Sequence, residues 1–167
     1  MTTSEGQAGV VLSVNVSPET GTRKKPVGSA GFILDRGVAE DAHAGDWHRQ
    51  VSLLACESID KMIEKGLDVG PGDFGENLTT SGLDLVSMPL GTRLEVGDSV
   101  VLEISQIGKE CHDRCAIYYQ AGDCVMPREG VFGVVIAAGS VSADDPVVVV
   151  GVGDGTCART PDPGAEG

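Results

Sequence analysis

Positive charge is scarce in this sequence. It carries 12 Lys and Arg residues against 25 Asp and Glu residues, which gives a formal net charge of -13. A protein surface of this sign repels phosphate backbones, so we expect no nucleic-acid partner. An anionic ligand could bind only if several of the few arginines lay together in one pocket.

Long apolar runs and secretion signals are absent as well. No apolar stretch approaches the ~18 residues of a membrane-spanning helix, so we expect no membrane association. Residues 1–9 lack the basic and apolar regions of a signal peptide. The five cysteines are odd in number and are not spaced as a disulfide framework. We therefore expect a cytoplasmic protein whose thiols are free or bind metal.

Aromatic residues make up only 4% of the chain, so the core must consist of Val, Ile, Leu and Ala side chains. Residues 55–65 have helical spacing, and Gly66 follows where a helix would end. Short β-rich runs predict strands at 9–16, 31–35, 51–54, 92–96, 99–107, 131–136 and 146–152. One helix among short strands predicts a mainly β, barrel-like domain over 9–152, between a flexible arm (1–8) and a mobile tail (153–167).

Two stretches of the chain, 92–107 and 70–82, carry a more detailed prediction. Residues 92–107 read as a hairpin around Gly97, with Val100, Leu102 and Ile104 on one face and Ser105 on the other. Residues 70–82 are too rich in glycine for a strand interior. They are either a plain loop or a backbone segment that approaches a ligand closely.

The first chemical cluster of the sequence is a group of thiols beside fixed positive charge. Cys111, His112, Arg114 and Cys115 lie within five residues, and Cys124 follows. Three thiolates and an imidazole would satisfy a tetrahedral zinc ion, and buried inert thiols are a second interpretation. The third is a reactive or metal-ligating thiolate, which the neighbouring guanidinium favours because positive charge lowers a thiol pKa.

A second cluster holds His43, His48 and Arg49 together with Asp41 and Asp46. These side chains could hold a divalent ion, or the histidines could be hydrogen-bonding scaffold residues. Arg49 is a candidate anion contact.

Three smaller features complete the candidates. Arg128 is either an anion contact or the partner of Glu129 in an ion pair. The basic run 23–25 is either a solvated loop or an anion-gathering segment. Cys56, near the start of the predicted helix, reads as a core thiol.

Five stretches, at 41–46, 49–54, 72–79, 111–115 and 122–130, resemble in content and order the MOSC family, named for the C-terminal domain of molybdenum cofactor sulfurases. The resemblance spans residues 9–152. It implies a β-barrel like that of the pyruvate kinase barrel domain. It also implies a role in binding the molybdenum cofactor (molybdopterin), or in handling sulfur for it.

The resemblance also implies roles for single residues. Cys115, preceded by Arg114, would ligate molybdenum or carry a persulfide. Cys111 and Cys124 are extra thiols beyond the family pattern, and they could serve as resolving partners or sulfur acceptors. Asn77 and the glycine-rich turn at Gly75 would position the cofactor. Further cofactor contacts would come from Arg49, Arg128, His112, His43 and His48.

The family's larger members differ from this chain in two ways. The N-terminal barrel domain of the amidoxime-reducing relatives and the pyridoxal-phosphate desulfurase domain of the sulfurases have no counterpart here. We therefore expect a module that binds the cofactor or relays sulfur, with the cofactor or a sulfur-donor protein as partner. The alternatives are a molybdenum-dependent reductase of N-hydroxylated compounds and a non-catalytic, zinc-stabilised partner protein.

Overall fold

The computed structural model describes residues 6–17, 24–39, 41, 44–45, 50–66, 68–74, 76–107 and 130–156. In these residues the chain forms eleven strands, one α-helix and one short 3-10 helix. The strands are β1 (Ala8–Val16), β2 (Lys25–Val27), β3 (Ser29–Ile33), β4 (Gly37–Val38), β5 (Val51–Ala55), β6 (Leu78–Ser81), β7 (Arg93–Val96), β8 (Val100–Ile107), β9 (Val131–Ala137), β10 (Gly139–Ser142) and β11 (Pro146–Gly151). The helices are α1 (Cys56–Glu64) and η1 (Leu85–Ser87).

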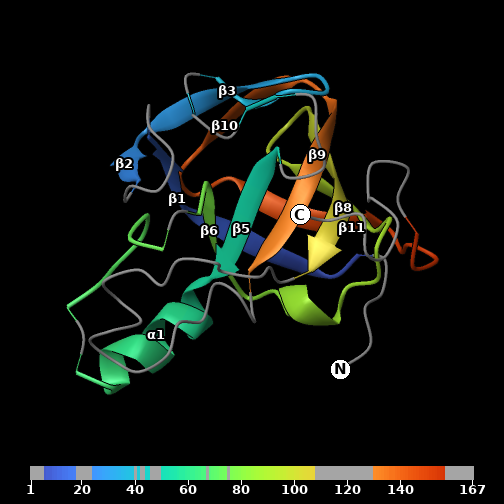
Figure 1. The fold of residues 1–167 in the computed structure, drawn as a ribbon. Coiled ribbons are helices and arrows are strands. Elements are labelled where there is room, and N and C mark those ends of the chain that lie inside the picture. The colour runs from blue at the N-terminus through green and yellow to red at the C-terminus, as the bar shows by residue number, and fades with distance from the viewer. Residues whose placement is uncertain are drawn as a thin grey trace.

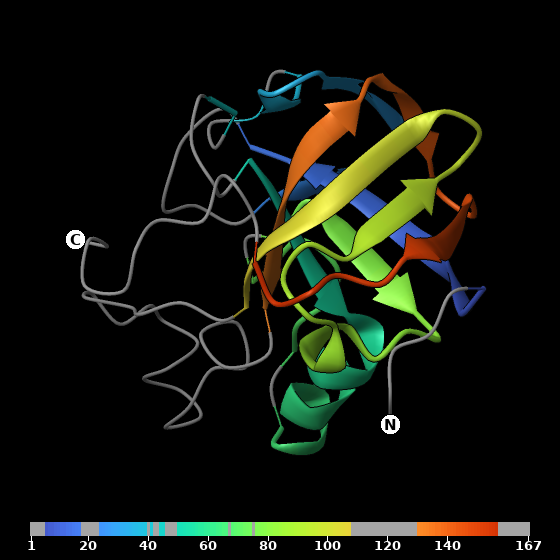
Figure 2. The same ribbon diagram turned by 90° about the vertical axis from the view of Figure 1, so that its right-hand side faces the viewer.

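Seven of the strands close into a barrel. Their order is β11-β7-β8-β9-β5-β6-β1, and β1 pairs with β11 to complete the ring. The β5–β6 pair is parallel and the other pairs are antiparallel, so the barrel is mixed. A three-stranded sheet, β10-β3-β4, lies at one end of the barrel and α1 at the other (Figures 1 and 2). The predicted mainly β barrel is therefore confirmed.

Aliphatic side chains fill the barrel, as the low aromatic content requires. In β8 the alternation places Val100, Leu102 and Ile104 in the core with no exposed surface. Beyond Ile104 the register with β9 shifts, and Ser105 is buried as well. The predicted hairpin is thus confirmed as β7 and β8, and the register shift next to Ser105 marks a bulge where the predicted alternation ends.

The helix α1 connects the parallel strands β5 and β6, and a smaller apolar cluster holds it in place. Ile59 and Met62 of the helix pack with Leu54, Phe74 and Phe132. The helix ends before Gly66, whose φ of +94° suits the left-handed position after a helix. Phe74 belongs to residues 70–76, so this cluster also holds that turn against the outside of the barrel.

Three sequence predictions differ from the fold. The glycine-rich stretch 70–82 was predicted to contain no strand, yet β6 occupies residues 78–81 of it and pairs with both β1 and β5. Cys56 is not a core thiol: it is the first residue of α1, it is only partly buried, and its Sγ lies 3.3 Å from Oε1 of Glu57. The first strand begins at Ala8, within the predicted arm.

Candidate functional site

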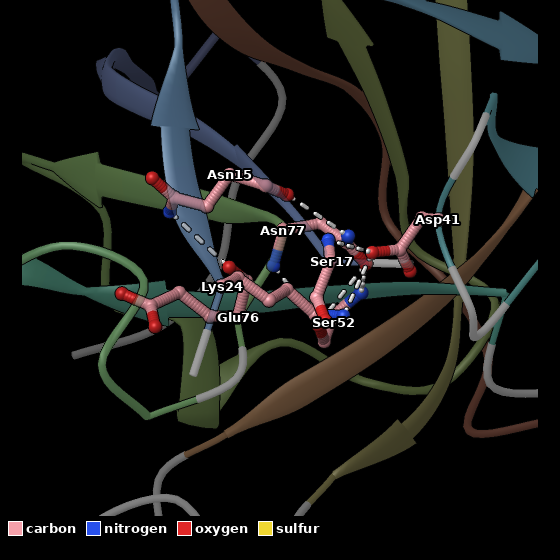
Figure 3. A network of polar contacts seen from close by, with 7 residues as sticks. All are labelled: Asn15, Ser17, Lys24, Asp41, Ser52, Glu76 and Asn77. Carbon is pink, nitrogen blue, oxygen red and sulfur yellow. Dashed lines mark hydrogen bonds and ion pairs between the residues drawn. The ribbon is translucent and has the colours of Figure 1, made fainter. Parts of the chain in front are cut away.

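A group of buried polar side chains lies on the outer face of the barrel wall, where β1, β6 and β5 run side by side. Val14 and Leu78 point into the barrel core, so their neighbours Ser13 and Thr79 point outward. We call this group the polar network, and Figure 3 shows most of it. Its buried members are Ser13, Asn15, Ser17, Lys24, Asp41, Ser52, Glu76, Asn77 and Thr79.

Asn77 joins two strands at the centre of the polar network. Its Oδ1 accepts hydrogen bonds from the backbone N–H of Ser52 at 3.0 Å and from the Ser52 hydroxyl at 3.1 Å. Its Nδ2 donates to the carbonyl oxygen of Asn15 at 3.2 Å. The backbone of Asn77 also donates its N–H to the carbonyl oxygen of Ser52 and accepts from the N–H of Asn15. Asn77 therefore extends β6 by one irregular residue and cross-links β1 to β5, with no exposed surface.

Lys24 and Asp41 form a buried ion pair next to Asn77 (Figure 3). The Lys24 Nζ lies 2.7 Å from Oδ1 of Asp41, and the backbone N–H of Ser17 donates to the same oxygen at 3.0 Å. Burial alone would raise the pKa of Asp41, but the Lys24 ammonium and the Ser17 amide outweigh it, so the pKa is lowered. Lys24 is thus neither solvated nor open to an external anion, and Asp41 serves Lys24 as its counter-ion.

Glu76 is the second buried acid of the polar network, and its surroundings differ. The Thr79 hydroxyl donates to Oε2 of Glu76 at 2.8 Å and accepts from Nδ2 of Asn15 at 3.1 Å. The other oxygen, Oε1, has no hydrogen-bond partner. Burial raises the pKa of Glu76, while the Gly72 amide and the Thr79 hydroxyl act in the opposite direction. The two buried carboxyl groups of the polar network, Asp41 and Glu76, therefore have pKa values shifted in opposite directions.

Among the predicted site residues, Asn77 lies in the described part of the chain. The others lie outside it: Cys111, Cys115, His112, Arg114, Arg128, Arg49, His43, His48 and Gly75. Their assignments remain predictions. The sequence analysis missed Asn15 and Glu76 as members of a buried network. The available signal for Glu76 was an acidic residue placed between Phe74 and the apolar start of β6.

The described flanks of the undescribed segments come together at the polar network. Ser17 and Lys24, which bracket residues 18–23, both contact Asp41, which precedes 42–43. On the other side, Ser52 pairs with Phe132 of β9, and Phe132 pairs with Gln106 of β8, one residue before the end of that strand. Two strand spacings correspond to about 10 Å, so Gln106 lies about that far from Ser52.

Described residues line two of the molecule's cavities. One, of about 350 Å³, opens at the β3 end of the barrel, and none of its described lining residues carries a charge: Val16, Val27, Ser29, Ala30, Gly31, Ala39 and Ser140. A cleft of about 390 Å³ lies between α1 and residues 82–86. Within the residues that the structure describes, no three His, Cys, Asp or Glu side chains gather as a metal site, and no helix is long and apolar enough to span a bilayer.

Comparisons with known proteins agree with this architecture. The family model described as the MOSC domain matches residues 40–148. The fold is similar to the YuaD protein of Bacillus subtilis (TM-score 0.73, 17% identity, covering 85% of this chain and 95% of that one). It is also similar to YiiM of Geobacillus stearothermophilus (TM-score 0.66, 21% identity, 88% and 77% covered). YiiM of Escherichia coli gives a TM-score of 0.60 at 24% identity, with 92% and 74% covered. A comparison with curated proteins found no match.

Proposed function

The chain belongs to the MOSC domain family, and on that premise we propose that it binds the molybdenum cofactor and presents Cys115 as a thiolate, either to the metal or to a transferred sulfur atom. The observation that carries the proposal is positional. The matched range, 40–148, contains all the predicted site residues. The described flanks of the segments 18–23, 42–43 and 108–129 lie at or near one buried polar network.

The residue chemistry supports the same proposal. A thiolate is a soft ligand suited to a sulfur-bound metal, and the adjacent Arg114 keeps Cys115 in that form. The cofactor carries a phosphate, so guanidinium groups at Arg49 and Arg128 would neutralise it. Because the whole chain has a net charge of -13, such local cations are needed to hold an anion against the general repulsion.

The described cavity at the β3 end and the Lys24–Asp41 pair add no net charge that would repel an anionic ligand. The cavity at the β3 end has no charged residue among its described lining, and the Lys24–Asp41 pair adds no net charge to the network. Asn77 uses both its amide oxygen and its amide nitrogen within the protein. Asn77 also has no exposed surface, so a direct contact from Asn77 to the cofactor would require the polar network to open. Within the proposal we therefore assign Asn77 the task of holding the turn 70–76 and the strand ends in place.

Bound cofactor would supply a metal centre for atom transfer. The chain would supply the positive charge of the arginines, the thiolate of Cys115 and the shape of the binding site. The test uses the full chain purified from a host that makes the cofactor, with molybdenum measured by mass spectrometry and pterin by fluorescence after oxidation. Cys115→Ser should lower retention of both by about tenfold or more, as loss of a metal ligand does.

Cys56→Ser is the matched control because Cys56 lies on α1, within the described fold, and burial raises the pKa of its thiol. This variant should retain the cofactor like the unmodified protein. If Cys115→Ser also retains both molybdenum and pterin, the ligand role of Cys115 is wrong. One tightly held zinc ion per chain without any pterin would favour the zinc-stabilised alternative.

A further inference from the structure

Glu76 is a fully buried carboxylic acid to which the proposed function gives no task. It has no exposed surface, and one of its oxygens, Oε1, lacks any hydrogen-bond partner. A buried carboxylate with an unsatisfied oxygen is costly. The Gly72 amide and the Thr79 hydroxyl favour its charged form, but the loss of hydration outweighs them. Such a group is retained more easily in its neutral form.

The described groups around Glu76 do not offer it a free counter-ion. β1 contributes Asn15 and β6 contributes Thr79, and both are neutral. The nearest cation in the polar network is Lys24, whose ammonium lies 2.7 Å from Asp41. In the turn itself, Asp73 accepts a hydrogen bond from the backbone N–H of Gly70 at 2.9 Å, so it adds a second acid and no positive charge.

The turn next to Glu76 is closely packed against the same elements. Gly72 has a φ of +89°, and a Cβ at this position would collide with the carbonyl oxygen of Lys24. The Gly72 carbonyl in turn accepts a hydrogen bond from the backbone N–H of Lys24 at 2.8 Å. Asn15 holds the carbonyl oxygen of Glu76 at 3.1 Å. A change at the Glu76 carboxyl group is therefore transmitted directly to the turn and to Asn77, which follows it.

We propose that Glu76 is a proton-operated lock on the turn to which residues 70–74, 76 and 77 belong: the neutral carboxyl group holds these residues against β1 and β6, and loss of its proton loosens them. The structure corresponds to the locked state. In the ionised state the charge on the unpartnered oxygen has to be hydrated, and hydration requires the turn to move away from the barrel wall.

The direction of the effect follows from linkage. Burial raises the pKa of Glu76, so over a range of pH the folded protein holds a proton that the unfolded chain has already lost. Stability contributed by the neutral group is full below the ordinary pKa of glutamic acid. It is lost as the pH rises through the raised value. This dependence is opposite in sign to that of Asp41, whose pKa is lowered.

The first test compares denaturation of the full chain and of Glu76→Gln at several values between about pH 5 and pH 8. The denaturation midpoint of the unmodified protein should fall relative to that of Glu76→Gln as the pH rises. Hydrogen exchange of the amides in 70–77, corrected for the intrinsic pH dependence, should speed up in the same range and only in the unmodified protein. A midpoint difference that stays constant with pH would overturn the proposal.

Asp73→Asn is the control, since it removes a carboxyl group from the same turn but leaves Glu76 in place. It should keep the pH dependence of the unmodified protein. A measurement on the unmodified protein alone guards against a variant that does not fold: carbon-13 NMR of labelled glutamate side chains should show one carboxyl group that titrates above the ordinary range of glutamic acid. If every glutamate titrates within that range, the proposal fails. No cofactor is needed in these experiments, so their failure leaves the role of Cys115 untouched.

Discussion

Replacing Lys24 with methionine should lower the free energy of unfolding by about 3–5 kcal/mol, because the change leaves the Asp41 carboxylate buried without its counter-ion. The two side chains are 1% and 0% exposed, with 2.7 Å between Nζ and Oδ1. At an effective dielectric constant of about 20, their attraction is about 6 kcal/mol. Desolvation of the two ions offsets most of this, so the intact pair is close to neutral for stability while the broken pair is not.

The double variant Lys24→Met with Asp41→Asn tests this reasoning. Asparagine keeps an oxygen that can accept from the Ser17 amide and carries no charge, so the double variant should lie within about 2 kcal/mol of the unmodified protein. Arg93→Met provides an exposed control: its Nε lies 3.2 Å from Glu103, the Arg93 side chain is 57% exposed, and the loss should stay below about 1 kcal/mol.

Urea denaturation followed by far-ultraviolet circular dichroism measures these differences in the free energy of unfolding. The comparison holds if the slope of that free energy against urea concentration is the same in each variant. The pH dependence adds a second check. Because the pKa of Asp41 is lowered in the folded protein, its contribution is present above the ordinary pKa and is lost as the pH falls through the lowered value. Lys24→Met and the unmodified protein should therefore approach each other in stability at acid pH. A loss below about 1 kcal/mol for Lys24→Met at neutral pH would refute the reasoning.

Three further substitutions probe the barrel wall and its turns by the same denaturation assay. Thr80→Val should stabilise the protein by about 0.5–2 kcal/mol, because the Thr80 hydroxyl is buried without a hydrogen-bond partner; a loss would mean that a partner exists. Gly72→Ala should cost about 2 kcal/mol or more, through both its positive φ and a collision with a backbone carbonyl, whereas Gly66→Ala, with a positive φ but open space, should cost about 1 kcal/mol. Equal losses at the two glycines would contradict the packing argument. Asn77→Ala should cost about 2–4 kcal/mol, since it removes the acceptor of two buried hydrogen bonds and the donor of a third; a loss below about 1 kcal/mol would show that water replaces them.

Local pattern was sufficient to predict the barrel and the family. The alternation of Val100, Leu102 and Ile104 identified a strand with one buried face, and helical spacing before Gly66 identified α1. Ordered motifs identified the MOSC family, which the match over residues 40–148 confirms. These features are local because each depends on side chains within one element or one short motif.

The same local reasoning failed wherever the answer depended on a distant neighbour. Residues 70–82 looked like a loop because of their glycines, but residues 78–81 pair with β1 and β5 and form a strand. Lys24 belongs to a basic run that resembles a solvated loop, yet Asp41, 17 residues away, holds it inside the protein. Cys56 has the apolar character of a core residue, but its place at the first turn of α1 leaves it partly exposed.

By itself, the sequence determined a mainly β chain with an aliphatic core, one helix and the motifs of a known family. The periodicity of apolar residues and the choice of turn residues are sufficient for that much. Only the tertiary structure decided which polar residues are buried together and with what charge. Asn77 meets Asn15 across 62 positions of the chain, and Glu76 lies where no free cation of the polar network reaches it. Burial and pairing of this kind depend on barrel closure, which brings together residues that no sequence window contains.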